Sequence, residues 1–259
     1  GKVAIVTGGA SGIGRALAEE LARRGASVTV ADINGQGAET VATAIVSAGG
    51  RARAAALDVS SASDVQALVA ETAAGGRLDY LFNNAGIAVL GEAEQFTPEI
   101  WRRSVDVNLW GVINGTMAAY PIMLRQGFGH IVNTASMAGL VPAPLEIAYT
   151  TTKYGVVGLS LALRTEAADR GVRVSVVCPG FVRTPILQSA RFLEGHREEL
   201  LARVPVRMAE PAEAARSILR GVGRNHAVII FPFHARLIVW LDRWFPRVSA
   251  WVWRKAVRE

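Results

Sequence analysis

The sequence predicts an α/β protein in which a doubly wound parallel β-sheet forms a single domain, followed by a helical extension at the C-terminal end. Short apolar runs alternate with helical patterns along most of the chain, and short links join them. Parallel strands need crossover connections, usually helices, so this alternation indicates a parallel sheet covered on both faces. The 259 residues, of which 51% are hydrophobic, suffice for one large core and exclude global disorder.

Composition excludes several other classes of protein. The single cysteine, Cys178, permits no intrachain disulfide and no cysteine-based zinc site, and it favours a reducing compartment such as the cytoplasm. The four histidines form no pattern typical of metal ligands, so we expect no metal. No uninterrupted apolar run reaches the roughly 18–20 residues of a membrane span. The net charge of +6 is concentrated in residues 234–259, so we expect no nucleic-acid partner.

The first strand, residues 2–7, runs directly into a glycine-rich turn and then into a helix over residues 15–24. This order is typical of a dinucleotide-binding turn, because glycines let the backbone approach a pyrophosphate and the helix N-terminus faces the anion. A glycine-rich turn that serves tight packing alone is the alternative. The candidate contacts in the turn are Gly8, Ser11, Gly12, Ile13 and Gly14.

The second strand, residues 27–31, ends at Asp32, twenty residues beyond Gly12. A carboxylate at this point accepts hydrogen bonds from the adenosine ribose hydroxyls and repels a 2′-phosphate. No basic residue follows Asp32 directly or interrupts the glycine turn. The position therefore favours NAD over NADP, and the alternative is that Asp32 caps the following helix.

The alternation continues along the chain, and polar residues follow several of the strands. Helices are expected over residues 36–47 and 62–74, and strands over residues 51–57, 78–82, 129–134, 172–177 and 227–231. Ligands bind at the carboxyl ends of the strands in open α/β sheets. Ser136, just past one strand, is therefore in a functional location. Asn108 lies in a long helix expected to start at Thr97 and Pro98, where a polar residue among apolar neighbours is typically packed and hydrogen-bonded.

Tyr149 and Lys153 lie four residues apart in a helix expected over residues 147–169, so they share one helix face. A nearby fixed cation favours the phenolate form of tyrosine, whose unperturbed pKa is about 10. The pair is therefore a candidate proton-transfer device. On its own such a pair is weak evidence, because tyrosine and lysine at this spacing are common on solvated helix faces.

Taken together, these pieces resemble the short-chain dehydrogenase/reductase family over about residues 2–231. The motifs are Thr7-Gly-Gly-Ala-Ser-Gly-Ile-Gly14, Asp58, Asn83-Asn-Ala-Gly86, Asn108, Ser136, Tyr149 with Lys153, and Pro179-Gly180 with Thr184. Each motif is unspecific alone, but all of them occur in order and in the expected structural context. The resemblance implies a single-domain Rossmann fold that binds a nicotinamide cofactor.

The resemblance also implies roles for individual residues. Tyr149 would be the general acid/base, Lys153 would lower its pKa and bind the nicotinamide ribose, and Ser136 would hold the substrate oxygen. Asn108 would help a proton relay to Lys153 through water. The implied cofactor contacts are the turn residues and Asp32 given above, Asp58, Val59, Asn84, Ala85, Gly86, Tyr149, Lys153, Pro179, Gly180, Val182 and Thr184.

The predicted function is hydride transfer between NAD and a secondary alcohol or its ketone. The alternatives are an NADP(H)-using carbonyl reductase and a non-catalytic NAD-binding interaction protein. Apolar residues after Ser136 and in a substrate lid at about residues 185–208, expected to form one or two helices, favour a lipophilic substrate such as a steroid, retinoid, terpenoid or long-chain alcohol. Family members pair helices across subunits, which implies a homodimer or homotetramer.

The tail departs from the family. We divide the chain into a domain of residues 1–233 and an amphipathic tail of residues 234–259, where Pro246 separates two helices. Four of the six tryptophans lie in this tail, interleaved with arginines. This pattern suits peripheral contact with a membrane surface, and the alternative is packing over the substrate pocket or a subunit interface.

Overall fold

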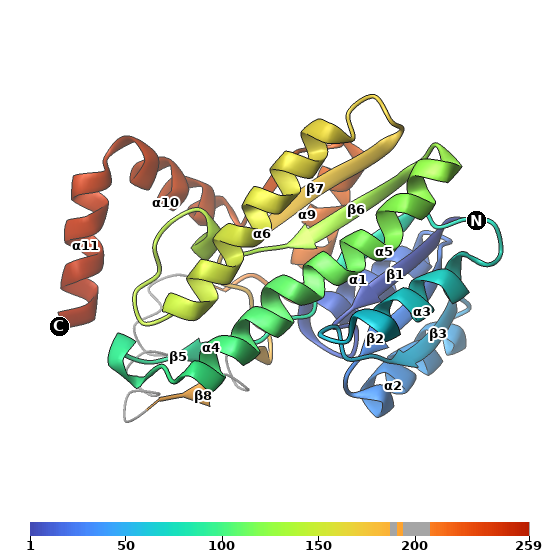
Figure 1. The fold of residues 1–259 in the computed structure, drawn as a ribbon, viewed down its shortest axis with the longest axis horizontal. Coiled ribbons are helices and arrows are strands. Elements are labelled where there is room, and N and C mark those ends of the chain that lie inside the picture. The colour runs from blue at the N-terminus through green and yellow to red at the C-terminus, as the bar shows by residue number, and fades with distance from the viewer. Residues whose placement is uncertain (187–190, 194–207, 259) are drawn as a thin grey trace.

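A computed structural model describes residues 1–186, 191–193 and 208–258 of the chain. Seven parallel strands form one sheet in the order β3-β2-β1-β4-β6-β7-β9, with helices on both faces (Figure 1). The strands of this sheet are β1 (Val3–Thr7), β2 (Ser27–Asp32), β3 (Arg51–Ala56), β4 (Tyr80–Asn83), β6 (Gly129–Thr134), β7 (Val172–Pro179) and β9 (Val228–Phe231). The prediction of a doubly wound parallel sheet is confirmed.

The helices lie in two layers. The helices are α1 (Gly12–Arg23), α2 (Gly35–Ser47), α3 (Ala62–Ala73), α4 (Pro98–Val105), α5 (Gly111–Gln126), α6 (Ile147–Glu166), α9 (Pro211–Gly223), α10 (Phe233–Trp244) and α11 (Pro246–Arg258). Apolar residues of α1, α2 and α9 form the core on one face of the sheet. Residues of α3, α5 and α6 form the core on the other face.

The topology of the sheet indicates where a ligand can bind. The chain leaves β1 toward β2 on one side and later returns to β4 on the other side, so the strand order reverses between β1 and β4. Connections on opposite faces diverge at such a point and open a crevice at the carboxyl ends of the strands. The glycine turn after β1 and the Asn84 segment after β4 lie on either side of this reversal.

The expected elements match the structure within a few residues, and the differences have local causes. Helix α1 begins at Gly12, three residues earlier than expected, because the end of the glycine turn already forms its first turn. Helix α6 ends at Glu166 rather than at residue 169. Thr97 caps α4 by accepting a hydrogen bond from the Ile100 N–H, and Pro98 is the first helical residue, as predicted.

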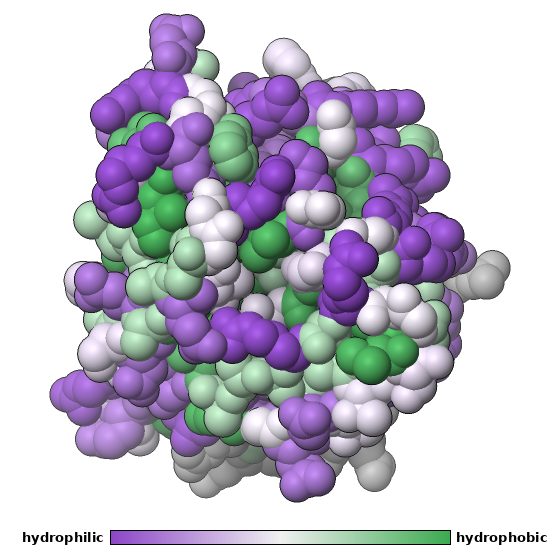
Figure 2. Space-filling view, turned by 90° about the vertical axis from the view of Figure 1, so that its right-hand side faces the viewer, coloured by the Kyte–Doolittle hydropathy of each residue, from purple (hydrophilic) through white to green (hydrophobic). Residues whose placement is uncertain are grey.

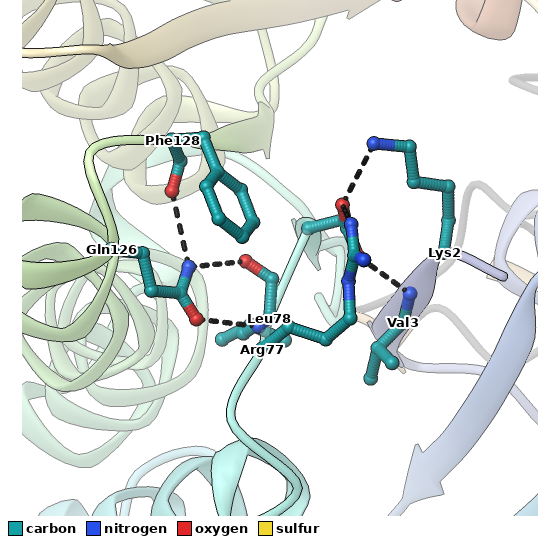
Figure 3. A network of polar contacts seen from close by, with 7 residues as sticks. Lys2, Val3, Arg77, Leu78, Gln126 and Phe128 are labelled. Carbon is teal, nitrogen blue, oxygen red and sulfur yellow. Dashed lines mark hydrogen bonds and ion pairs between the residues drawn. The ribbon is translucent and has the colours of Figure 1, made fainter.

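The amino ends of β1 and β4 are joined by the buried carboxylate of Asp79, whose partners Lys2, Val3 and Arg77 are labelled in Figure 3. It accepts hydrogen bonds from the Lys2 ammonium at 2.9 Å, from the Val3 N–H at 2.8 Å and from the Arg77 guanidinium at 2.6 and 2.8 Å. The Gln126 amide beside it bonds both backbone groups of Leu78. From this side, where the N-terminus lies, hydrophilic residues dominate the surface and apolar residues are interspersed (Figure 2).

The tail forms the two helices that its pattern predicts. Helix α10 starts immediately after β9, α11 begins at Pro246, and the pair extends from the end of the sheet opposite the N-terminus (Figure 1). Ala235 of α10 is fully buried, and a Cβ added to Gly180 would lie 2.8 Å from its Cβ, so α10 packs directly on the backbone after β7.

Only part of the expected lid is described. Arg191–Phe192 forms a short strand, β8, that pairs with β5 (Val89–Leu90), so these two residues are not helical as expected. The remainder of the expected lid helices, residues 187–190 and 194–207, lies outside the described residues. None of the helices that the structure describes is both long enough and apolar enough to cross a membrane.

Candidate active site

One cavity of about 1000 Å³ occupies the carboxyl ends of the strands. Its wall is formed by the turns after β1, β2, β3, β4, β6 and β7, by the start of α6, and by α10 and α11. The predicted residues that lie in this wall are Gly8, Ser11, Gly12, Ile13, Asp32, Asp58, Val59, Asn84, Ala85, Gly86, Ser136, Tyr149, Lys153, Pro179, Gly180, Val182 and Thr184. Two predicted residues, Gly14 and Asn108, lie behind it.

The glycine turn is packed so closely that side chains are excluded. A Cβ on Gly14 would lie 2.0 Å from the Gly8 carbonyl oxygen, and one on Gly8, whose φ is +65°, would lie 2.8 Å from the Cα of Ala85. Gly12 also has a positive φ, +53°, and a Cβ added to it would lie 3.2 Å from the Thr184 side chain. The N-terminus of α1 therefore opens directly on the cavity, which is the geometry that an approaching pyrophosphate requires.

Asp32 faces the cavity from the end of β2 and does not cap α2. One carboxylate oxygen accepts a hydrogen bond from the Ala10 N–H at 3.0 Å, and the other accepts one from the Asn34 N–H at 2.9 Å. Asn34, not Asp32, is the N-cap of α2. The capping alternative is therefore wrong. The two bonds hold the carboxylate rigidly beside the glycine turn, with further lone pairs open to a ribose hydroxyl.

Thr7 and Asn84 join the two strands at which the strand order reverses. The Thr7 hydroxyl accepts hydrogen bonds from the N–H groups of Asn84 and Ala85, at 2.9 and 3.1 Å. The Asn84 amide donates to the Thr7 carbonyl at 3.0 Å. These bonds keep the floor of the cavity at a fixed width, so the small residues Ala85 and Gly86 leave room for a flat ring.

Ser136, Tyr149 and Lys153 meet in the deepest part of the wall. Lys153 is 2% exposed, and its ammonium donates a hydrogen bond to the Thr134 carbonyl at 2.9 Å. The same nitrogen lies 5.4 Å from the centre of the Tyr149 ring. Ser136 caps a short helical turn by accepting a hydrogen bond from the Ala138 N–H, and it also hydrogen-bonds the Tyr149 hydroxyl. A hydroxyl, a phenol and an ammonium thus face one point.

The pKa of Tyr149 moves in the direction opposite to the implied one. Burial raises it above the ordinary value, the neighbouring Glu146 carboxylate raises it further, and the hydrogen bond from Ser136 opposes both. Burial also lowers the pKa of Lys153 to about 8. The expectation considered only charge, whereas desolvation disfavours both the phenolate and the ammonium.

Asn108 lies behind the cavity in a stretch of π-helix, Asp106–Trp110, between α4 and α5. It is fully buried, its amide donates to the Ile87 carbonyl at 2.9 Å, and its oxygen accepts from the Ile87 N–H at 2.8 Å. A Cβ on Gly86 would lie 3.1 Å from this oxygen and 3.6 Å from the Lys153 nitrogen. Asn108 and Lys153 therefore approach the same spot from opposite sides. π-Helical turns are frequent at functional sites.

The wall also contains residues that the sequence argument did not select. Glu146 precedes α6, and Ile33 follows Asp32. The tail adds Ile238, Leu241, Phe245, Val248, Ser249, Val252 and Trp253. The signal for the tail was present, because its helical apolar spacing predicted a packing face. For Glu146 no motif existed, since a lone glutamate among apolar residues is an ordinary surface pattern.

No group of three or more histidine, cysteine, aspartate or glutamate side chains is placed to hold a metal ion within the described part of the chain. Cys178 is a free, fully buried thiol in β7, and burial raises its pKa to about 12.

A glycine turn at the reversal of strand order, an acidic residue at the tip of β2 and a serine, a tyrosine and a lysine at one point define a dinucleotide-dependent oxidoreductase. The sequence profile of the short chain dehydrogenase family matches residues 2–193. The chain belongs to the short-chain dehydrogenase/reductase family. It is an NAD(P)-dependent enzyme that acts on CH–OH groups, as the relatives described next indicate.

Two curated relatives are named as dehydrogenases of alcohols. The chain is 40% identical over 222 residues to a cyclohexanol dehydrogenase of Acinetobacter sp. strain SE19, an alignment that covers 84% of this chain and 86% of the relative. It is 41% identical to a D-threitol dehydrogenase of Mycolicibacterium smegmatis over 83% of each chain. A solved short chain dehydrogenase/reductase from Burkholderia phymatum, in complex with NAD, superposes with a TM-score of 0.88 at 29% identity and covers 96% of this chain and 95% of its own.

Proposed function

We propose that this enzyme interconverts a lipophilic secondary alcohol and its ketone with NAD as the cofactor. The observation that carries the proposal is the convergence of Ser136, Tyr149 and Lys153 on one point of a cavity that also contains the glycine turn. When bound, the oxidised nicotinamide accepts the hydrogen that leaves the substrate carbon with its electron pair. The protein's own groups then have to handle one proton and hold the substrate oxygen.

In the oxidation of an alcohol, Ser136 donates or accepts a hydrogen bond at the substrate oxygen and fixes it against Tyr149. Tyr149, as the phenolate, accepts the hydroxyl proton as the C–H bond breaks and becomes the phenol, and as the phenol it returns this proton in the reverse direction. Lys153 places its positive charge beside the phenol, which opposes the effect of burial on the phenolate. Asn108 keeps the backbone around Ile87 fixed behind Lys153 and serves a water relay to that ammonium.

The Tyr149→Phe variant tests this assignment. Removing the phenol should lower kcat by about 10²–10⁴-fold, which is the usual contribution of a general acid/base, with the Kd of NAD changed little. Turnover is followed by NADH absorbance and NAD binding by fluorescence titration. Retention of near-normal turnover would refute the role of Tyr149, and a Tyr154→Phe variant, which changes a half-exposed tyrosine on the same helix, serves as the matched control.

The proposed preference for NAD rests on Asp32 and on the charges around it. Within the described wall of the cavity, the basic residues are Arg103 and Lys153, on α4 and α6, and neither belongs to the segments that flank Asp32. A 2′-phosphate would therefore meet a carboxylate without a compensating cation. The Asp32→Ala variant should lower kcat/KM for NAD. The ratio of kcat/KM for NAD to kcat/KM for NADP should therefore decrease. An unchanged ratio would contradict the proposal.

The lipophilic substrate is supported by the apolar residues around the reacting point. Met137 and Val141 follow Ser136, and the tail contributes Ile238, Phe245 and Trp253 to the same wall. An apolar pocket with few polar groups binds a lipophilic ligand in preference to a sugar. A panel of alicyclic, steroid and long-chain alcohols, measured against sugars of equal size, tests this. Higher kcat/KM for the sugars would contradict it.

The implied assembly is a homodimer or homotetramer through α5 and α6. Both helices carry large apolar side chains that are exposed in the single chain, with Met117 at 66% and Leu161 at 37%. Light scattering of the purified chain measures the mass directly. A monomer at micromolar concentration would contradict the implied assembly.

For the tail, we propose a domain of residues 1–233 with an appended helical segment that covers the pocket and touches membrane surfaces from a cytoplasmic location. Trp244 and Trp251 are 64% and 59% exposed, while Trp253 faces the cavity. Exposed tryptophans beside arginines suit the headgroup region of a bilayer. Replacing Trp244 and Trp251 by serine should reduce sedimentation with anionic vesicles, and equal sedimentation would remove the membrane proposal.

A further inference from the structure

Glu146 is the one acidic side chain in the described cavity wall that lies on the helix of Tyr149. Glu146 is the N-cap residue of α6 and Tyr149 is its third helical residue, so the two residues lie within one turn of the chain. The charge of the Glu146 carboxylate raises the pKa of the Tyr149 phenol, and both residues line the same cavity. A substrate whose reacting oxygen contacts Tyr149 therefore extends past Glu146.

Within the part of the chain that the structure describes, the carboxylate of Glu146 makes no hydrogen bond or ion pair that would stabilise the fold. Glu146 is the N-cap residue of α6, yet its side chain makes no capping hydrogen bond. Its backbone is used, since the N–H donates to the Ala143 carbonyl and the carbonyl accepts from the Thr150 N–H. Among the described residues, no partner hydrogen-bonds or pairs with its carboxylate oxygens. A half-buried carboxyl group without a partner costs stability, so a ligand contact explains it better than packing does.

The backbone before Glu146 is held in an uncommon conformation. Leu145 has a φ of +66°, in the left-handed region that bulky residues rarely adopt, and its carbonyl accepts a hydrogen bond from the Gly91 N–H at 2.9 Å. This turn directs residues 145 and 146 into the cavity wall at the start of α6. Strained residues of this kind persist where the surrounding structure fixes them, often at ligand contacts.

We infer that Glu146 binds a second hydroxyl group of the substrate, so that this enzyme prefers lipophilic diols to the corresponding monoalcohols. The inference rests on the proposed alcohol dehydrogenase function and specifies its substrate class. The apolar wall binds the carbon frame, Tyr149 and Ser136 receive the reacting hydroxyl, and Glu146 accepts a hydrogen bond from the other hydroxyl.

Other ligand groups fit this position less well. A cationic amine would meet the Lys153 ammonium in the same cavity, and an anionic group would meet the charge of Glu146 itself. Burial raises the pKa of Glu146 to about 7, so near neutral pH the carboxyl group is present in both forms. Either form has an oxygen that accepts a hydrogen bond from a neutral hydroxyl.

The test compares cyclohexanol with the cyclohexane-1,2-, 1,3- and 1,4-diols, using the intact chain and NADH absorbance. For at least one diol, kcat/KM should exceed that of cyclohexanol by about tenfold or more. Glu146→Leu should lower the ratio of kcat/KM for that diol to kcat/KM for cyclohexanol by about 10- to 100-fold. The ratio is the readout because the loss of this carboxylate also acts on Tyr149, and that effect is common to both alcohols. Glu146→Gln, whose amide oxygen still accepts a hydrogen bond, should retain part of the preference.

The control variant is Glu166→Gln, which changes an exposed glutamate at the far end of the same helix. It should leave the ratio of diol to monoalcohol unchanged. Equal kcat/KM values for all four alcohols with the unaltered enzyme, or an equal loss for diol and monoalcohol in Glu146→Leu, would overturn the inference while the alcohol dehydrogenase function stands.

A binding measurement separates the two proposals. In the Tyr149→Phe background, the diol should raise the melting temperature in the presence of NAD, and the added Glu146→Leu change should abolish this rise. If no alcohol is oxidised by the unaltered enzyme, the proposed function fails, and this measurement then decides the inference alone. Equal shifts with and without Glu146 would overturn it.

Discussion

Two carboxyl groups near opposite ends of the sheet, those of Asp79 and Glu146, have pKa values shifted in opposite directions. At the amino ends of the strands, burial disfavours the charge of Asp79, but hydrogen bonds from Arg77, Val3 and Lys2 outweigh it and lower the pKa to about 2. At the carboxyl ends, Glu146 has no such partners, and burial alone raises its pKa to about 7. The difference lies in the number of donors that the fold supplies.

The two ends of the sheet differ in how many of their polar groups are already paired with protein partners. The Asp79 carboxylate accepts hydrogen bonds from Lys2, Val3 and Arg77, so it joins β1 to the segment before β4 and is already occupied by protein donors. The cavity end leaves a carboxyl group, an amine and a phenol with shifted pKa values inside one pocket. Perturbed groups gathered in a cleft are typical of active sites.

The largest expected effect comes from Lys153→Met, which should lower kcat by about 10²-fold or more, because the phenol loses its neighbouring positive charge. The free energy of unfolding should fall by no more than about 1 kcal/mol, since burial already disfavours the ammonium. Steady-state kinetics and urea unfolding measure the two quantities. A large loss of unfolding free energy with a normal kcat would show that Lys153 stabilises the fold and does not take part in catalysis.

Asp79→Asn should lower the free energy of unfolding by about 2–3 kcal/mol, because several charge-assisted hydrogen bonds lose their acceptor. Turnover well below the melting temperature should be unchanged. The control is Glu71→Gln, which breaks an ion pair between Arg53 and a side chain that is 67% exposed, and it should cost about 0–1 kcal/mol. An equal decrease in the unfolding free energy of both variants would contradict the idea that the buried Asp79 network contributes more stability than an exposed ion pair.

The two carboxyl groups should give stability opposite dependences on pH. Since the folded pKa of Asp79 is depressed, its contribution of roughly 2 kcal/mol is full above about pH 4 and is lost as pH falls toward 2. Since the folded pKa of Glu146 is raised, stability falls by about 1–3 kcal/mol as pH rises from about 4.5 to 7. Glu146→Gln should remove the second change only, as measured by urea unfolding across this range.

The smallest effect is expected for Gln126→Leu, at about 1–2 kcal/mol of unfolding free energy, because the amide holds the backbone groups of Leu78 and the Phe128 carbonyl at a half-buried position. kcat should not change, since the site lies at the other end of the sheet. A drop in kcat without unfolding would show that the two ends are coupled.

Most of the fold followed from local patterns. Glycine turns, apolar runs and the cap at Thr97 predict the elements, and strand order predicts that the ends of β1, β2, β4 and β6 meet. The positions of Ser136 and Tyr149 therefore needed no coordinates beyond this topology. Element bounds shifted by a few residues because a turn such as Gly12 joins the helix that follows it.

What could not be predicted depends on contacts between distant segments. The spacing of Leu237 and Leu241 predicted that the tail has an apolar face, but Leu237 is exposed and only Leu241 of the two lines the cavity. The pattern could not show that Ile238 packs in one cluster with Met137. The direction of the pKa shift of Tyr149 depends on how much water the tail and the turn before α6 exclude. The place of Glu146 in the cavity wall depends on the left-handed conformation of Leu145, which the sequence did not indicate.

The position of α10 and α11 has a consequence for biosynthesis. The residues of the cavity wall span the chain from Gly8 to Trp253, and those of α10 and α11 are translated after those of the sheet. A nascent chain can complete its sheet through β7 while this side of the pocket is still missing. If the tail contacts the substrate as proposed, this part of the pocket forms after the glycine turn and Asp32 are in place, and variation in α10 and α11 is expected to change substrate choice more than cofactor choice.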